Sequence, residues 1–569
     1  MFDFKFHGMK TFITIIFLTC CLNSFGQASI IKELNKGWKF KQRNKATWHK
    51  ASIPGTIHTD LLENKLIEDP FYRDNEKKVQ WISHHDWEYK TNFSLTETEL
   101  KQDSIYIQFE GLDTYADVTL NGHPILYTEN MFRTYTLNVK AYLKKINTLQ
   151  IIFYSADSIV NIKAKAALPL VRPCENNRHY VRKAQYHFGW DWAPKLTTCG
   201  IWRPVKLVFG TLPVEPMSQY ADVDLVREQD SIGISFYFTV KGKPTFMRGA
   251  NWVPADVFLP RISKEKYRSL LIAAKEANFN MLRVWGGGIY EDDYFYDLCD
   301  SLGLYVWQDF MFAGAMYPIT SSNIENLKAE LRDNIIRLRK HPCIVLWCGN
   351  NEIDEAWHNW GWQKQFKINT SDSSFLWQEY QQLFQKVIPE MLSELDPGRP
   401  YLSSSPVLGW GRKESMTNGD SHYWGMWWGM DSLHVMKQKI PRFMSEFGMQ
   451  AMPNFETIQQ YSIASDWDTA SVVMKTHQKH STGYTTISKY LKMEQIPFHD
   501  FNSFVIASQE LQSRALQTAI ESQTNSNGRC MGSLFWQFND CWPVCSWSVV
   551  DYFGRKKKAY FTVKQAFEN

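Results

Sequence analysis

Residues 344–352 read IVLWCGNNE, a continuous apolar run that ends in two asparagines and a glutamate. Strands buried on both faces of a parallel sheet have such unbroken apolar runs. Amphipathic helical stretches at 263–277, 323–339 and 375–395 separate several of these runs, and another at 509–523 precedes the last. This alternation predicts a closed (β/α)8 barrel, the larger part of a multidomain chain. The eight expected strands are 246–251, 281–285, 304–309, 344–349, 401–405, 419–424, 443–447 and 533–538.

The region before the barrel, residues 27–210, follows a two-residue alternation instead. Short strands are expected at 104–109, 116–120 and 149–153. Asn121-Gly122 directly follows the second of these strands, and this dipeptide strongly favours a hairpin turn. This pattern predicts an antiparallel jelly-roll β-sandwich. We expect a short linker at 211–235 and the barrel domain at 236–569.

Length and composition limit the possible classes of protein. At 569 residues the chain exceeds what one hydrophobic core usually organises. Its 23 Trp, 26 Tyr and 36 Phe indicate bulky cores or flat aromatic faces for a ligand. A net charge of +4 gives no strong field, so nucleic acid is not an expected partner.

The N-terminus is expected to be a secretory signal, residues 1–26. Met9 and Lys10 precede a short apolar run at 12–22, and Ser24 and Gly26 suit a peptidase that cleaves before Gln27. Translation starts at Met1 or Met9, and a lipoprotein signal at 18–21 is the alternative. No later run has 18 apolar residues, so we expect no membrane span and a secreted or periplasmic protein.

Eight cysteines remain after the signal, in a compartment where disulfides persist. None has the spacing of a metal site, so no metal is expected. Cys174 and Cys199 are a candidate disulfide, while the overall pairing stays open.

Two expected strands end in a glutamate. Glu352 follows the fourth strand and Glu446 the seventh, and these strands face each other across the barrel mouth. Glycosidic bond cleavage needs two carboxyl groups, one protonated and one ionised, and a separation of about 5–5.5 Å gives retention of configuration. The spacing does not say which of them holds the proton.

Other strand ends carry aromatic and polar groups suited to a sugar, whose apolar face stacks on rings and whose hydroxyls form hydrogen bonds. We expect these residues to bind substrate: Arg283, Trp285, Gln308, Asp309, His422, Tyr423 and Trp536.

Five motifs, at 248–256, 285–291, 307–313, 349–352 and 445–448, together resemble a β-mannosidase of glycoside hydrolase family 2. The resemblance covers nearly all of the mature chain. It implies retaining exo-hydrolysis of terminal β-D-mannose without a cofactor. It also implies that Glu352 is the acid/base, Glu446 the nucleophile and Asn351 a partner of the sugar's 2-hydroxyl.

In similar enzymes a loop of the sandwich, which is of the galactose-binding-like type, reaches over the barrel mouth. Here the matching residues are Trp190, Asp191 and Trp192, expected at the terminal-sugar subsite. Such relatives insert an immunoglobulin-like domain of about 100 residues before the barrel. The 211–235 linker is expected to be too short for this domain, and we do not expect the further β domains that relatives carry after the barrel.

Two alternatives stay open. The missing domains could leave a carbohydrate-binding pseudoenzyme, or the enzyme could be a β-glucosaminidase or an endo-β-mannosidase. Hydrolysis of a panel of aryl glycosides separates these possibilities. The natural glycan and the oligomeric state are not predicted.

Overall fold

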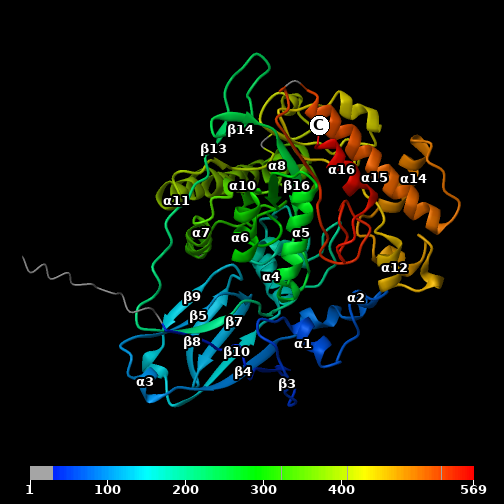
Figure 1. Ribbon diagram of the computed structural model, residues 1–569. Helices are drawn as coiled ribbons and strands as arrows, with labels where there is room; N and C mark the ends of the chain where they lie inside the picture. The colour runs from blue at the N-terminus through cyan, green and yellow to red at the C-terminus, as the bar shows by residue number, and fades with distance from the viewer. Residues whose placement is uncertain (1–29, 322, 407, 527, 569) are drawn as a thin grey trace, which may run out of the picture.

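The computed structural model describes residues 30–321, 323–406, 408–526 and 528–568. The expected signal at 1–26 lies outside them. The described chain builds an N-terminal sandwich, a small three-stranded sheet and a barrel with its helices (Figure 1). Within these ranges, every helix is too short or too polar to cross a bilayer.

The sandwich consists of two antiparallel sheets. One has the order β1 (Ile30–Glu33), β12 (Val205–Phe209), β5 (Ile105–Phe109) and β9 (Tyr135–Asn138). The other has the order β3 (His49–Lys50), β2 (Lys39–Gln42), β4 (Trp87–Ser94), β10 (Ile146–Phe153), β7 (Tyr115–Leu120) and β8 (His123–Glu129). A short pair joins β6 (Leu112–Asp113) to β11 (Gly200–Ile201).

Local sequence explains these strands. Alternate side chains of β5 and β10 are buried, as the two-residue alternation predicts. The β7–β8 hairpin turns at Asn121 and Gly122, whose φ angles are 53° and 82°. Two positive φ values are those of a type I′ turn, which Asn-Gly favours. The predicted jelly-roll class is therefore confirmed.

A three-stranded sheet lies at the end of the barrel where its strands begin. It pairs β13 (Val223–Val226) with β14 (Tyr237–Val240), and β14 with β15 (Lys243–Thr245). The buried ring of Phe236 lies 5.9 Å from Trp307 and 5.1 Å from Phe443 inside the barrel. Figure 1 shows this sheet at the end of the barrel that is far from the sandwich.

Eight parallel strands form the barrel, and all eight predicted strands are present. They are β16 (Met247–Trp252), β17 (Met281–Val284), β18 (Tyr305–Asp309), β19 (Ile344–Cys348), β20 (Tyr401–Leu402), β21 (Asp420–His422), β22 (Phe443–Glu446) and β23 (Gly532–Phe535). The strand order is β20-β19-β18-β17-β16-β23-β22-β21. The predicted (β/α)8 architecture is therefore confirmed.

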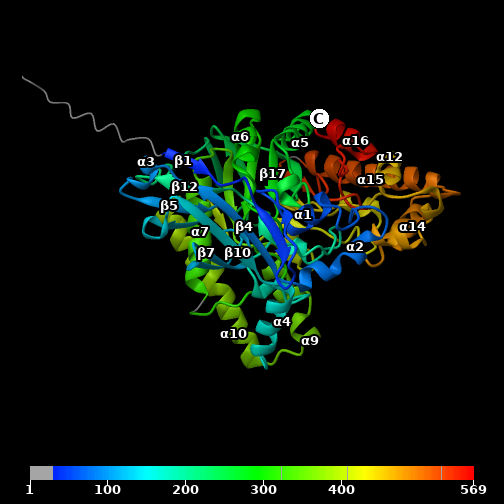
Figure 2. The same cartoon turned by 90° about the horizontal axis from the view of Figure 1, so that it is seen from below.

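Helices surround the barrel. They are α5 (Lys264–Glu276), α6 (Asp293–Leu302), α7 (Ile324–Leu338), α8 (Ile353–Asn359), α9 (Trp362–Gln365), α10 (Thr370–Gln381), α11 (Ile388–Leu395), α12 (Phe455–Tyr461), α13 (Val472–Thr476), α14 (Gly483–Met493), α15 (Phe501–Thr524) and α16 (Lys558–Ala566). Four more belong to the sandwich: α1 (Ile57–Glu63), α2 (Asn75–Lys78), α3 (Glu97–Leu100) and α4 (Ala156–Ala166). In α5, Ser263 caps the first turn by accepting the Lys266 N–H at 3.1 Å. Both views place α14 on the opposite side of the molecule from β5 (Figures 1 and 2).

The candidate disulfide between Cys174 and Cys199 is not formed. Both thiols are free, as are the other six cysteines of the described residues. Burial raises the pKa of the Cys174 and Cys199 thiols, so both stay protonated near neutral pH.

The sandwich contacts the barrel directly through α7. Arg182 of the sandwich donates from Nη2 to Glu330 Oε1 at 2.6 Å and from Nε to Oε2 at 2.8 Å. Asn130 Nδ2 donates to the same Oε2 at 2.8 Å, and Tyr290 OH to Oε1 at 3.1 Å. Glu330 is fully buried, so this ion pair is shielded from water. Figures 1 and 2 both show α7 beside the sandwich.

We expect Glu330→Ala to destabilise the protein, because it leaves the Arg182 guanidinium buried without its partner. Breaking a buried pair costs about 3–5 kcal/mol. The melting temperature should fall by several degrees. The matched control is Glu325→Ala on the same helix, where the exposed pair with Lys328 contributes less than about 1 kcal/mol. Equal melting temperatures for both variants would show that this contact does not hold the two domains together.

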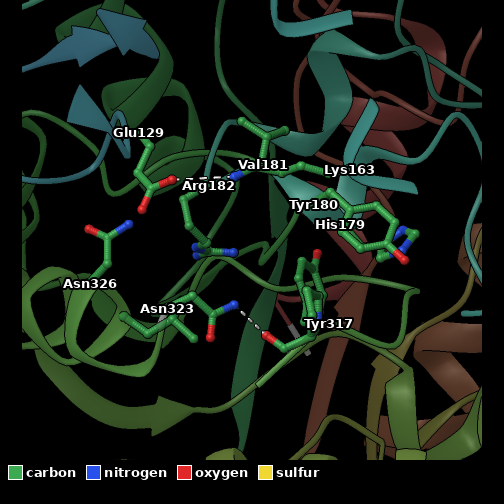
Figure 3. A pocket seen from close by; sticks show the side chains of 11 residues that line it. Glu129, Lys163, His179, Tyr180, Val181, Arg182, Tyr317, Asn323 and Asn326 are labelled. Carbon is green, nitrogen blue, oxygen red and sulfur yellow. Dashed lines mark hydrogen bonds and ion pairs between the residues drawn. The ribbon is translucent and has the colours of Figure 1, made fainter. Parts of the chain in front are cut away.

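A small cavity of about 40 Å³ lies beside this contact, at the junction of sandwich and barrel (Figure 3). The residues that line it include Glu129, Lys163, His179, Arg182 and Tyr317. Its volume is far below the range of about 300–1,000 Å³ typical of ligand pockets and suits a few water molecules. A sugar must therefore bind elsewhere.

Candidate functional site

A larger cleft opens at the carboxyl ends of the barrel strands, with a volume of about 1,030 Å³. Glu352, which follows β19, and Glu446, the last residue of β22, both line it. Arg283 of β17 and His422 of β21 lie beneath the two carboxylates. Parallel strands bring these ends together because they all terminate at the same rim of the barrel.

Glu352 and Glu446 meet across this rim. His422 Nδ1 lies 2.9 Å from Glu352 Oε1 and 3.2 Å from Glu446 Oε2. One oxygen of each carboxylate and this nitrogen all lie within 4.8 Å of one another. Carboxyl groups about 5–5.5 Å apart belong to retaining glycosidases, whereas inverting enzymes separate them by about 6.5–9.5 Å. The geometry therefore suits a retaining mechanism.

Arg283 anchors Glu446 to the barrel interior. Its Nη1 donates to Glu446 Oε1 at 2.5 Å and to Asn251 Oδ1 at 3.0 Å. Its Nη2 donates to Asp309 Oδ2 at 2.9 Å and to Asn351 Oδ1 at 2.8 Å. The Arg283 side chain is fully buried, so this planar fork fixes the position of Glu446.

The two carboxylates differ in their electrostatic surroundings. Burial, and then the charge of Glu446, raise the pKa of Glu352 well above its ordinary value. Burial also raises the pKa of Glu446, to about 7, while the Arg283 guanidinium opposes that rise. Glu446 has the direct ion pair with Arg283, so it loses its proton first. The remaining proton then stays on Glu352.

His422 is neutral in this setting. Burial, and then the charge of Arg283, hold its pKa well below the ordinary value of 6.5. Its Nε2 lies 3.0 Å from Ser405 Oγ, and Ser405 donates to Asp420 Oδ2 at 2.7 Å. The imidazole is therefore held from below while Nδ1 faces both glutamates.

The paired asparagines before Glu352 have different roles. Asn350 Oδ1 accepts the backbone N–H of Ile353 at 3.0 Å, which fixes the turn at the end of β19. In this turn Glu352 has a φ of 61°, a left-handed conformation that is uncommon for a residue with a side chain. Asn351 instead lines the cleft, and its Nδ2 lies 3.3 Å from Glu352 Oε2.

Three tryptophans of the cleft lining pack against one another, and we call this part of the cleft its closed end. Trp190 reaches it from the sandwich, and its ring lies 4.8 Å from that of Trp285 in an edge-to-face arrangement. The Trp285 ring lies 5.5 Å from Trp536. Asp191 also lines the cleft, and burial together with the Glu446 charge raises its pKa to about 7. The sandwich thus contributes to this end even though the linker is short.

Four of the expected substrate-binding residues lie behind the cleft. Trp192 is fully buried and packs against Trp285 and Trp536. Gln308 accepts the Tyr296 hydroxyl at 2.6 Å, and Tyr423 donates to Asp431 at 2.5 Å. Asp309 is held by Arg283. These four support the residues that line the cleft. His422, as described, contacts the carboxylates from below.

Sequence reasoning missed several residues that line the cleft. Arg178 places its guanidinium 4.6 Å from the Trp190 ring centroid and donates to Ala313 O at 2.9 Å. It begins a three-residue 3-10 helix, Arg178–Tyr180, with no motif to mark it. The Trp424 side chain lies close enough to Glu446 to lower the pKa of that carboxyl, and Trp424, Glu355 and Trp428 all line the cleft. The density of tryptophan directly after the sixth strand was a usable signal for Trp424 and Trp428.

Within the described ranges, two groups of acidic and imidazole side chains lie close enough to share a cation. One is Glu352, His422 and Glu446, and the other is Asp297, Asp300 and His341. In the first, the Arg283 guanidinium already supplies the positive charge beside Glu446. In the second, Asp300 accepts from the backbone of Cys343 at 2.7 Å and contacts His341 at 2.8 Å. The hydrogen bonds of both groups are made without an ion.

Comparisons with known proteins agree on one family. Residues 38–203 match the glycosyl hydrolase 2 galactose-binding domain-like family. The chain is 32% identical to β-mannosidase B of Thermothelomyces thermophilus and 29% identical to the β-mannosidase of Rattus norvegicus. Each alignment covers 94% of this chain, with 76% of the first relative and 75% of the second. The rat alignment spans 671 positions, more than this chain's 569 residues, so the relative carries extra residues inside the matched region.

Comparison with solved structures gives the same family. The β-D-mannosidase of Dictyoglomus thermophilum superposes with a TM-score of 0.88 at 36% identity, covering 95% of this chain and 78% of that one. An exo-chitosanase of Amycolatopsis orientalis shares the fold, with a TM-score of 0.69 at 16% identity, covering 95% of this chain and 74% of that one. From the identity and coverage of the mannosidase matches, the chain belongs to the β-mannosidases of glycoside hydrolase family 2.

Proposed function

We propose that this chain is a retaining exo-β-mannosidase that hydrolyses terminal non-reducing β-D-mannose from oligosaccharides or glycoprotein glycans. The observation that carries the proposal is the convergence of Glu352 and Glu446 within 4.8 Å of a shared imidazole nitrogen. Membership in the β-mannosidase family supports the choice of sugar. No cofactor takes part in the proposed reaction.

The proposed reaction has two displacements. In the first, a Glu446 oxygen attacks the anomeric carbon, the bond to the leaving oxygen breaks, and the Glu352 proton moves to that oxygen. In the second, Glu352 takes a proton from water, the water oxygen attacks the anomeric carbon, and the bond to Glu446 breaks. Arg283 keeps Glu446 ionised for the first attack. Asn351, held between Arg283 and Glu352, is placed to bind the 2-hydroxyl.

Exo action is supported by the closed end of the cleft. Trp190, Trp285 and Trp536 line the cleft and pack against one another, and in this proposal they close it beyond a single terminal ring. Asp191 there is placed to hydrogen-bond hydroxyls of that ring. An endo-acting enzyme would need the cleft to continue past these rings.

A panel of aryl glycosides tests the choice of sugar. We expect kcat/KM for the aryl β-D-mannoside to exceed those for the β-glucoside, β-galactoside and β-glucosaminide by about 100-fold or more, because a site that hydrogen-bonds an axial 2-hydroxyl rejects the equatorial epimer. Glu446→Gln, purified and assayed in parallel, is the background control, because any hydrolysis left in this variant comes from contaminating enzymes. A preference for the glucosaminide would instead favour a β-glucosaminidase. Mannose binding without turnover would favour a pseudoenzyme.

Secretion is part of the proposal but has a different basis. It depends on the apolar run at 12–22 and on Ser24 and Gly26, which lie outside the described residues. Mass spectrometry of the exported protein should show an N-terminus at Gln27.

A further inference from the structure

The cleft is much larger than one sugar ring requires. Its volume of about 1,030 Å³ matches the upper end of pockets that enclose whole drug-sized ligands. The closed end already accommodates the terminal ring. The rest of the cleft must therefore face whatever is attached to the leaving oxygen.

Exposure of the tryptophans distinguishes the two ends of the cleft. At the closed end, Trp285 and Trp536 are only 1% and 5% exposed. Three other tryptophans that line the same cleft, Trp360, Trp410 and Trp428, are 45%, 37% and 58% exposed. Leaving one large apolar ring in water is ordinary, but several around one cleft indicate a binding surface.

Two of these rings are connected to the general acid through helix α8. Helix α8 starts directly after Glu352, and Trp360 caps its C-terminal end. Trp360 is therefore separated from the general acid by about two turns of helix. A general acid protonates the leaving oxygen, so the leaving group departs on its side of the ring plane. Trp360, which also lines the cleft, is therefore at the far end of the helix that follows the acid.

A buried carboxylate holds the second ring in the same place. Glu355 of α8 accepts the backbone N–H of Gly409 at 2.8 Å and the Asn359 amide at 2.5 Å through Oε2. Gly409 directly precedes Trp410, whose ring packs edge-on at 6.1 Å against Tyr423. Glu355 is 2% exposed, so it ties the Trp410 loop to the helix that carries Trp360.

The third ring reaches the cleft from another loop. The Trp428 backbone N–H donates to Trp424 O at 2.8 Å, and the Trp424 side chain contacts Glu446. The Trp428 ring lies 4.4 Å from that of His480. Next to His480 along the chain, Lys479 also lines the cleft, and its charge is paired with that of Glu76.

We propose that Trp360, Trp410 and Trp428 form an aglycone platform that binds neutral pyranose rings beyond the scissile bond. This inference rests on the proposed function and specifies its substrates as oligosaccharides of at least two or three sugar units. Pyranose rings have apolar C–H faces that stack on exposed aromatic rings, while their hydroxyls stay hydrated at the rim. A charged or single-ring aglycone would make little use of this surface.

Two substrates that share the terminal mannose but differ in their aglycone test the platform. Methyl β-D-mannoside carries no ring beyond the scissile bond, whereas β-1,4-mannotriose carries two. For Trp428→Ala and for Trp410→Ala, kcat/KM on mannotriose should fall about tenfold, while kcat/KM on the methyl glycoside changes less than about twofold. Trp81→Ala, at a ring 39% exposed on the sandwich and outside the cleft lining, is the matched control and should change neither.

The outcomes separate this inference from the function on which it rests. Unchanged mannotriose kinetics in both variants, or equal losses on both substrates, would overturn the platform. Failure of the unmodified protein to cleave either mannoside would overturn the proposed function instead. Because Trp428 is more than half exposed, its replacement leaves the core intact and keeps the test valid if Trp410→Ala folds poorly.

Discussion

Replacing Glu446 with alanine should reduce hydrolysis of an aryl β-mannoside by about 10⁴-fold or more, because no carboxylate remains to attack the anomeric carbon. Azide should partly restore turnover, since the small anion fits the space that the side chain leaves. Azide would attack from the Glu446 side in a single displacement. The product should therefore be α-mannosyl azide, with inverted configuration, which NMR identifies directly.

Glu352→Ala should give the opposite stereochemistry. This variant keeps Glu446, so a mannoside with a good leaving group still forms the covalent intermediate without acid assistance. Azide would then attack the intermediate from the Glu352 side and release β-mannosyl azide with net retention. The two products together assign the roles of the two carboxylates, which a simple loss of activity does not.

A control separates these effects from loss of structure. Glu276→Gln, on the surface end of α5 in an ion pair with Lys556, removes a glutamate charge outside the cleft and should leave turnover unchanged. β-Azide from Glu446→Ala, or α-azide from Glu352→Ala, would mean that the two roles are exchanged. Inverted mannose from the unmodified enzyme would contradict the double displacement itself.

The barrel was predictable because its signals are local and repeated. Runs such as 344–348 are apolar on every residue, as burial on both faces of a parallel strand requires. Strands β20 and β21 are two and three residues long, shorter than their apolar runs suggested. Beyond these short strands, Ser405 forms only an isolated β-bridge with Asn351. The apolar pattern of the sequence does not distinguish such a bridge from a continuous strand.

The small three-stranded sheet at the end where the barrel strands begin was not predicted. Residues 211–235 were expected to be a linker, and β13 lies within them, while the β14–β15 hairpin lies just beyond. Phe236 and Phe238 look like ordinary strand residues until the barrel interior provides Trp307 and Phe443 as packing partners. Such tertiary contacts override local propensity and leave no short-range signal.

The site was predictable in its residue types but only partly in their positions. A glutamate at a strand end must lie at the barrel rim, so Glu352 and Glu446 followed from topology. Sequence placed Trp192 and Gln308 at the same rim, yet their side chains point into the protein and contact Trp285 and Tyr296. Which way a side chain near the rim points depends on three-dimensional packing, which is why Glu355 of α8 and Arg178 were also missed.

Arg283→Lys should lower kcat/KM for an aryl β-mannoside by about 10²–10³-fold, the loss typical when one preorganised donor is removed from a buried site. The arginine reaches Glu446 and Asp309 with separate nitrogens, at 2.5 and 2.9 Å. A lysine has one ammonium on a flexible stem and cannot occupy both positions. Glu446 would then lose much of its stabilising positive charge and its fixed position.

The pH profile of Arg283→Lys gives a readout that a general loss of packing would not move. Activity requires Glu446 ionised and Glu352 protonated, so it falls at low pH as Glu446 gains a proton and at high pH as Glu352 loses one. Arg283 opposes the rise in the pKa of Glu446 caused by burial. Weakening that contact raises the pKa further, so the acid limb should move to higher pH. Arg337→Lys, which disturbs the ion pair with Asp293 outside the cleft lining, should leave the limb in place. An acid limb that stays fixed in Arg283→Lys would show that Arg283 only packs the barrel and does not keep Glu446 ionised.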